Sequence, residues 1–330
     1  MAERVLITGA TGFVGYHLIE KALAAGLEVY AAVRTGSDRS HLLSFAINYV
    51  GFDYNSIDSL VNTLETYQFS YIIHAAGITK AKTRLDYDRV NAEYTRNLAM
   101  AAIRANIKLK KFVFVSSLAA LGPLTELSSE ICDDTPGHPV TNYGRSKLLA
   151  EQYLSEIEGL PLIVIRPTAV YGPREKDIFI LFKSISRGME PHIGSFRQQL
   201  SFIYVKDLAD VIITALFTAV SGKSYNVSDG QVYDRYILAK LTKKALKIKT
   251  FRFHIPVGIV GLMAIMMDLL YTYSKDTPAL NREKMAELTA INWACNIDRA
   301  RKELNYLPKF GLEEGLNETM IWYKENGWLK

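Results

Sequence analysis

Cysteine is scarce in this chain, which has only Cys132 and Cys295 among its 330 residues. Two thiols in a chain of this size do not form a disulfide framework, so we expect them to be reduced. The sequence passes directly into a strand pattern at residues 5–7, which leaves no room for a signal peptide. Both observations predict a cytoplasmic protein.

A strong charge of one sign is also lacking. The chain has 39 Lys and Arg against 34 Asp and Glu, a net charge of +5 that looks scattered, without a long basic run. This argues against a nucleic-acid partner and leaves only a weak attraction to anionic ligands or surfaces. The hydrophobic share of 49% excludes a disordered chain and is enough for a large core.

No apolar run is long enough to cross a membrane. The longest uncharged segment of this kind covers residues 255–267, contains Pro256 and two glycines, and continues to residue 271 after Asp268. A spanning helix needs about 20 apolar residues. We predict a helix that is buried or covers the substrate cleft, with a peripheral membrane contact as the less favoured alternative.

The first half alternates short apolar runs with stretches of helical spacing. The apolar runs are residues 5–7, 29–33, 47–50, 71–73, 112–115 and 162–165, and the helical stretches include 13–25, 91–105 and 143–157. This pattern predicts an α/β protein with a Rossmann-like, doubly wound parallel sheet. The pattern loosens after residue 172. We therefore expect a nucleotide-binding domain at 1–172 and a smaller C-terminal substrate-binding lobe at 173–330, interleaved with it.

Three glycines, Gly9, Gly12 and Gly15, follow the first apolar run and precede the first helical stretch. In that context glycines permit a tight turn and a close approach of the backbone to a pyrophosphate, which binds at the helix N-terminus. The spacing is one residue longer than G-x-G-x-x-G. An ordinary strand–helix turn is the alternative to a dinucleotide site.

The end of the second apolar run indicates which nicotinamide cofactor binds. NAD-binding proteins place a carboxylate there for the ribose 2′-hydroxyl, but this chain has Arg34 and no acid until Asp38. A guanidinium suits the 2′-phosphate of NADP. NADP is therefore favoured over NAD, unless Arg34 is only a surface residue.

The third motif joins a serine of the pair Ser116 and Ser117 to Tyr143 and Lys147. A tyrosine and a lysine four residues apart share one helix face, and we expect the ammonium to lower the tyrosine pKa from its usual ~10. Together with the glycine turn, this set offers both a site for a hydride carrier and a proton donor.

With these motifs the chain resembles the extended short-chain dehydrogenases/reductases, the NAD-dependent epimerase/dehydratase group, over nearly its whole length. The segments that carry the resemblance are 8–15, 74–77, 116–122, 143–147, 166–173 and 202–209. The C-terminal segments 293–295, 311–316 and 322–328 resemble the branch of proteins similar to 3β-hydroxysteroid dehydrogenase and dihydroflavonol reductase.

The resemblance implies roles for individual residues. Tyr143 would be the catalytic acid/base, Lys147 would hold the ribose hydroxyls, and Ser117 would bind the reacting oxygen. The implied cofactor-binding residues are Gly9, Thr11, Gly12, Phe13, Val14, Gly15, Arg34, Asp53 at the adenine, Ala75, Ala76, Tyr143, Lys147, and Pro167 and Val170 near the nicotinamide. No metal is expected. His74 is more simply a core histidine, while Asn91 is either packing or site-ordering.

Two departures from the family pattern concern the substrate. Leu118 and Ala119 follow Ser117 where dehydratases carry an acid, and Ala169 stands where nucleotide-sugar epimerases usually carry asparagine. Both favour an oxidoreductase that interconverts a secondary alcohol and a ketone on a hydrophobic or mixed-polarity substrate. A sugar or nucleotide-sugar epimerase is the alternative, and a cofactor-sensing regulatory protein is a third reading. The resemblance also implies a homodimer formed through residues 89–105 and 146–157.

Overall fold

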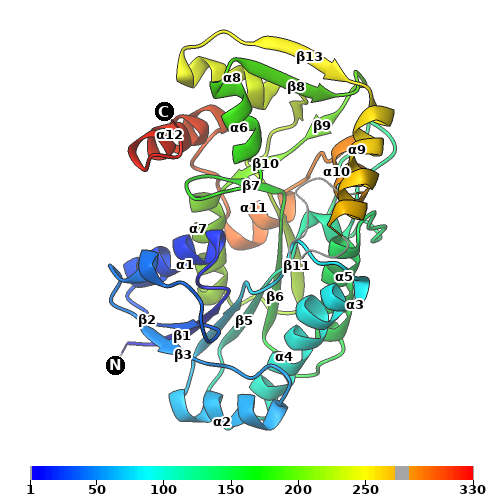
Figure 1. Cartoon of the computed structure of the whole chain (residues 1–330). Coiled ribbons are helices and arrows are strands. Elements are labelled where there is room, and N and C mark those ends of the chain that lie inside the picture. Colours follow the sequence, from blue (N-terminus) through cyan, green and yellow to red (C-terminus); the bar gives the residue numbers. More distant parts are fainter. Residues whose placement is uncertain (1, 272–281, 330) are drawn as a thin grey trace.

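The computed structural model describes residues 2–271 and 282–329 (Figure 1). A seven-stranded parallel sheet lies at its centre, with the strand order β3-β2-β1-β4-β5-β6-β11. These strands are β1 (Arg4–Thr8), β2 (Glu28–Ala32), β3 (Asn48–Val50), β4 (Tyr71–His74), β5 (Lys111–Val115), β6 (Leu162–Pro167) and β11 (Lys223–Val227). The predicted Rossmann-like sheet is confirmed.

The strands are buried on both faces, which explains why their sequences are almost continuously apolar. In β1, Val5 and Ile7 enter the core on one face and Leu6 enters the core on the other. The first face is covered by α1 (Phe13–Ala24), α7 (Val205–Phe217) and α11 (Asp298–Leu304), and the second by α2 (Ile57–Tyr67), α4 (Tyr94–Arg104) and α5 (Asn142–Ser155).

The strand order reverses between β1 and β4. From β1 the chain moves outward through β2 to β3, and then returns to place β4 on the other side of β1. In doubly wound sheets, ligands bind in the crevice outside the carboxyl ends of the strands at such a reversal. The glycine turn after β1 and residues 75–77 after β4 lie at this point.

A lobe with its own core sits above the carboxyl edge of the sheet (Figure 1). Its core includes Tyr171, Phe182, Leu238, Leu316 and Tyr323. It contains the strand pairs β7 (Ala169–Tyr171) with β10 (Phe202–Tyr204), β8 (Met189–Ile193) with β13 (Phe251–Ile255), and β9 (Gln199–Leu200) with β12 (Tyr233–Asp234), and the helices α6 (Phe179–Ser186), α8 (Ile237–Leu246) and α12 (Leu312–Glu325).

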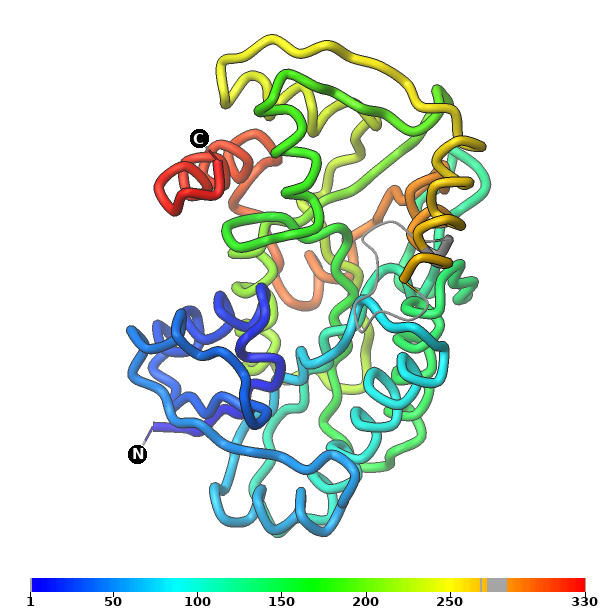
Figure 2. The backbone as a smooth tube through the Cα atoms, in the orientation of Figure 1, coloured from blue at the N-terminus to red at the C-terminus, as the bar shows by residue number. Residues whose placement is uncertain are grey.

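The chain passes between sheet and lobe more than once, as the tube in Figure 2 shows. The sheet strand β11 and the sheet-covering helix α7 both come from beyond residue 172. The predicted domain boundary at residue 172 therefore stays a prediction, because segments from beyond it belong to the sheet layer.

Short, irregular helical segments lie before α4 and between β5 and α5. Before α4 the chain forms α3 (Arg84–Tyr87) and a π-helical segment (Asp88–Glu93), so the helix expected from residue 91 begins inside the π-helical turn. Before α5 a 3₁₀ helix (Leu118–Ala120) follows β5. π-helical turns inside helices frequently lie at functional sites, and this one carries Asn91.

The apolar segment forms the helix α9 (Val257–Leu270), followed in the described chain by α10 (Arg282–Thr289). Val260 and Ala264 of α9 pack against Met285 of α10. Within residues 2–271 and 282–329, none of the helices combines the length and apolarity needed to cross a membrane. The thiols Cys132 and Cys295 are both free.

Candidate active site

The glycine turn is packed so closely that side chains would not fit. Gly9 has a φ of +69°, and a Cβ there would lie 2.6 Å from the carbonyl oxygen of Ala75. A Cβ on Gly15 would lie 2.1 Å from the carbonyl oxygen of Gly9. The Gly12 amide donates to that same oxygen at 2.9 Å. The turn therefore lies directly against the residues that follow β4.

The N-terminus of α1 is open to an anion. Its N-cap, Gly12, gives no side-chain cap, and no acidic residue occupies the first turn. The free amide groups and the helix dipole at such an end favour a phosphate. Phe13 and Val14 open the helix, and Val14 and Val170 pack against the cores of both the sheet and the lobe. These residues fit a dinucleotide lying across the turn.

A buried polar network holds the end of β4. The Thr8 hydroxyl lies 2.8 Å from His74 Nδ1 and accepts from the Ala76 amide at 3.1 Å. His74 Nε2 lies 2.8 Å from the Thr95 hydroxyl. Burial lowers the His74 pKa to about 3, with the Lys147 charge as a smaller cause, so the imidazole is neutral. The interpretation of His74 as a satisfied core histidine is confirmed.

The residues predicted at the adenosine end follow the next two strands. Arg34 is exposed just beyond β2, where its charge acts on the partly buried Tyr54 phenol. Asp53 follows β3, and its Oδ1 accepts from the backbone amide of Asn55 at 3.0 Å and from its Nδ2 at 3.1 Å. Both lie at the carboxyl edge of the sheet, on the β2–β3 side of the crevice.

The residues predicted at the nicotinamide end of the crevice belong to β6 and β7. Pro167 ends β6 and Val170 lies in β7. Between them, the Thr168 hydroxyl is buried and has no hydrogen-bond partner within the described chain. A buried hydroxyl without a partner beside the crevice suits a polar group of a bound cofactor. Ala169, by contrast, is exposed.

The structure brings Ser117 and Tyr143 together. Ser117 follows β5, and its hydroxyl accepts from the Ala119 amide at 3.2 Å. Tyr143 lies in the first turn of α5, whose N-cap Thr141 accepts from the Gly144 amide at 3.0 Å. A Cβ on Gly144 would lie 2.3 Å from the Ala119 carbonyl oxygen, so the helix packs directly on the Ser117 loop. A side-chain hydrogen bond joins Ser117 to Tyr143.

Lys147 lies one turn further along α5 and is buried. Its Nζ donates to the Val115 carbonyl oxygen at 2.9 Å and lies 4.8 Å from the centre of the Phe114 ring. Burial lowers the Lys147 pKa to about 8, while the Glu151 charge opposes this shift. Desolvation therefore disfavours the charged form of this lysine.

One sequence-based expectation is wrong in direction. Burial raises the Tyr143 pKa to about 12, although the hydrogen bond from Ser117 opposes this shift. The Glu287 and Tyr87 side chains raise this pKa further. The Lys147 ammonium is directed at the Val115 carbonyl instead, so desolvation of the phenol outweighs any stabilisation of its phenolate.

Asn91 connects the π-helical segment to both β4 and α5. It is fully buried, its Oδ1 accepts from the Ile78 amide at 2.8 Å, and its Nδ2 donates to the Ile78 carbonyl at 3.0 Å. Its Nδ2 also donates to the Ser146 hydroxyl at 2.9 Å, and that hydroxyl donates to the Tyr143 carbonyl at 2.8 Å. Of its two possible roles, these contacts favour the ordering of the site.

Sequence reasoning did not find Glu287. This residue of α10 pairs with Lys284 at 2.7 Å, and its charge acts on Tyr143. The Trp293 indole donates to its carbonyl oxygen at 3.2 Å. Because α10 lies more than a hundred residues beyond Tyr143 in the chain, no local pattern could have linked the two.

A doubly wound sheet, a glycine turn at its reversal point and a Ser–Tyr–Lys set beside it define a protein of the extended short-chain dehydrogenase/reductase type. The model of the NAD dependent epimerase/dehydratase family matches residues 5–228. The chain belongs to that family.

Relatives in this family have different activities. The chain is 28% identical to a ceramide reductase of Caulobacter vibrioides, covering 98% of this chain and 96% of the relative. It is 26% identical to a UDP-glucose 4-epimerase of Vibrio cholerae, covering 97% and 95%. The solved structure of a Thermotoga maritima UDP-glucose 4-epimerase with UDP-glucose superposes with a TM-score of 0.80 at 20% identity, covering 98% and 99%.

Proposed function

We propose that this protein is an NAD(P)-dependent oxidoreductase that interconverts a secondary alcohol and a ketone. One observation carries the proposal. Ser117, Tyr143 and Lys147 lie together at the crevice beside which the glycine turn also lies. A bound nicotinamide supplies the donor or acceptor of a hydride. The protein supplies the proton and holds the reacting oxygen.

In this mechanism Tyr143 carries the proton. A pKa of about 12 keeps the phenol protonated at neutral pH, so it is ready to donate to the oxygen of a ketone. The Ser117 hydroxyl binds the same oxygen. Lys147 has three N–H donors, of which one is directed at Val115, so the others can hold the ribose hydroxyls. At neutral pH the tyrosine is therefore in the protonated form that the reduction of a ketone requires.

An apolar or mixed-polarity substrate is supported by the residues around the site. Leu118 and Ala119 are buried beside Ser117 and bring no second acid for the elimination of water. Ala169 offers a methyl group where a polar side chain would bind a sugar nucleotide. The likeness to a ceramide reductase supports a substrate with a large apolar part.

A sugar or nucleotide-sugar epimerase is the second candidate, and the likeness to UDP-glucose 4-epimerase favours it. An epimerase oxidises and re-reduces its substrate, so it consumes no net cofactor. A cofactor-sensing regulatory protein would bind the cofactor and turn nothing over. Net consumption of reduced cofactor with a ketone substrate therefore supports the proposed oxidoreductase over both alternatives.

NADP is the proposed cofactor, and Arg34 is the residue that tests it. Loss of one charge-assisted contact to the 2′-phosphate should weaken binding by about tenfold or more. Arg34→Ala should therefore weaken the binding of NADPH by this factor and leave the binding of NADH almost unchanged. Fluorescence titration measures both affinities. The control Lys108→Ala alters an exposed basic residue elsewhere and should change the affinity for neither cofactor. Equal losses for both cofactors, or a wild-type preference for NADH, would contradict the assignment.

The pH profile should respond to Glu287. Its negative charge opposes the Tyr143 phenolate, so Glu287→Gln should lower the tyrosine pKa. Alcohol oxidation needs the phenolate, so its rate rises with pH, and this ascending limb should move to lower pH by up to about one unit. Steady-state kcat/KM against pH measures the shift, with the exposed Glu325→Gln as control. An unchanged profile would show that the charge of Glu287 does not act on Tyr143.

A homodimer remains a prediction. In the two segments predicted to pair, Leu98 and Ala102 are buried in the protein's own core, whereas Leu149 and Tyr153 of α5 stay partly exposed. We expect light scattering to give the mass of a dimer at micromolar concentration, and a monomer would contradict this.

A further inference from the structure

Apart from Asp268, the helix α9 consists of apolar residues and glycines, and among the described residues it is covered on one side. Its inner side packs on Met285 through Val260 and Ala264. Its exposed apolar side chains, between 39% and 73% accessible, are Val257, Ile259, Leu262, Met263, Ile265, Met266, Leu269 and Leu270. A surface helix ordinarily presents polar residues to water, and an apolar patch of this extent marks an interaction site.

The chain leading into α9 is strongly basic. Residues 235–267 contain seven Lys and Arg and no Asp or Glu. The positive charge is therefore not scattered along the chain as the composition indicated. Lys240, Lys244, Lys247 and Lys249 are exposed, and Phe251, in the strand β13 that leads to α9, is 74% accessible.

A buried carboxylate holds this basic stretch in place. Glu190 of β8 is fully buried and accepts hydrogen bonds from Lys243 at 2.5 Å, Thr250 at 2.7 Å and Arg252 at 2.6 Å. β13 pairs in parallel with β8 along its whole length. One carboxylate thus pairs with two of the cations, and Lys244 pairs with Glu313. The other exposed lysines and Phe251 lie at the rim of the lobe.

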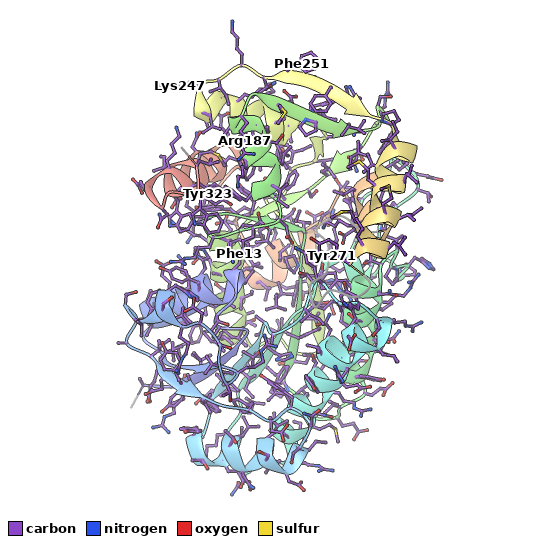
Figure 3. All side chains as sticks on the ribbon, in the orientation of Figure 1. Phe13, Arg187, Lys247, Phe251, Tyr271 and Tyr323 are labelled. Carbon is purple, nitrogen blue, oxygen red and sulfur yellow. The ribbon has the colours of Figure 1, made fainter. Side chains whose placement is uncertain are left out.

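The lysines and α9 lie at the two ends of β13. Five residues of strand span about 17 Å, so the exposed lysines before the strand and the first turns of α9 after it form one edge. From α9, which runs along the side of the molecule next to α10, this edge reaches β13 at the end of the lobe farthest from α2 (Figure 1). Figure 3 shows Lys247 and Phe251 there, at the outer limit of the molecule.

We propose that this edge, formed by residues 247–251 and the exposed face of α9, docks on the surface of an anionic lipid bilayer. Lysines beside a membrane bind acidic headgroups, while an apolar helix of this length lies in the interface rather than crossing it. Residues 235–268 carry seven Lys and Arg against the single acid Asp268, so this net positive charge opposes the pairing of the segment with its own copy. A nucleic acid would leave the apolar face of α9 uncovered.

The docking edge is linked to the candidate active site. α9 packs on α10, and α10 carries Glu287, whose charge acts on Tyr143. Docking would bring that side of the substrate crevice close to the lipid surface. The docking itself does not depend on the proposed reaction, so the two can fail separately.

Flotation with lipid vesicles tests the docking. The full-length protein should float with vesicles of phosphatidylcholine containing phosphatidylglycerol, and at least about tenfold less with phosphatidylcholine alone. High salt should weaken the binding, because salt screens the lysine charges. Failure of the wild-type protein to bind the anionic vesicles would overturn the proposal.

Matched variants separate this edge from the rest of the surface. Lys247→Glu/Lys249→Glu and Leu262→Ser/Met266→Ser should each weaken binding by about tenfold or more. The controls Lys108→Glu/Lys302→Glu and Leu43→Ser/Leu307→Ser change exposed residues elsewhere and should bind as the wild type does. All four should keep the wild-type unfolding midpoint, because the altered side chains are exposed.

Two results would contradict the assignment. Equal losses in the controls would show that binding is not confined to this edge. Self-association of the wild type that Leu262→Ser/Met266→Ser abolishes, without any vesicle binding, would assign the face of α9 to a second copy of the chain.

Discussion

Tyr143→Phe should lower kcat by about 10²–10⁴-fold, because only the proposed proton donor is removed and positioned proton transfer contributes that much. Affinity for the cofactor should change by no more than about threefold, since the hydroxyl is a minor part of the cofactor contact. Stopped-flow or steady-state turnover gives the first quantity and fluorescence titration gives the second.

The matched control lies on the same helix. Tyr153→Phe removes the hydroxyl of a partly exposed tyrosine, under the Arg96 guanidinium and away from Ser117, and should keep wild-type turnover. If Tyr143→Phe keeps more than about a tenth of wild-type kcat, Tyr143 is not the acid/base.

Gly15→Ala should abolish measurable cofactor binding and destabilise the fold. The added Cβ would lie 2.1 Å from the Gly9 carbonyl oxygen and 2.7 Å from Ala10 Cα, both of which are backbone atoms that cannot rotate away. The turn must open, at a cost of about 1–3 kcal/mol or more. Thermal unfolding and cofactor titration measure the two effects.

Gly261→Ala is the control for that substitution. It is also a helical glycine, but no atom lies within 4 Å of the Cβ it would gain, and alanine is the better helix former by about 1 kcal/mol. It should bind cofactor normally and unfold no earlier than the wild type. Normal cofactor binding by Gly15→Ala would contradict the packing of the turn described above.

The sheet was predictable because its sequence signal is local. Runs such as Val5 to Ile7 are apolar at every position, which is typical of a short strand buried on both faces. The glycine turn was predictable for the same reason, since its spacing directly follows a strand. The contribution of β11 to the sheet was not predictable. This strand follows the lobe segments in the chain, and nothing in its own sequence indicates which sheet it joins.

The chemistry of the site was less predictable than its residues. The proximity of Ser117 and Tyr143 followed from the family resemblance, and the structure agrees with it. The direction of the Tyr143 pKa shift did not follow, because it depends on burial and on Tyr87 and Glu287, which come from elements distant in sequence. Apolarity alone likewise could not tell whether α9 was buried or exposed.

The measurement that tests the central claim most directly follows the reduced cofactor and the substrate together. Purified protein with NADPH is offered apolar ketones, oxo-steroids and nucleotide sugars, and both the loss of reduced-nicotinamide absorbance and the product are quantified over many turnovers. The account predicts one NADPH consumed for each secondary alcohol formed from an apolar ketone, and no consumption by Tyr143→Phe. Interconversion of a sugar nucleotide over many turnovers, with no net change in the cofactor, would contradict it.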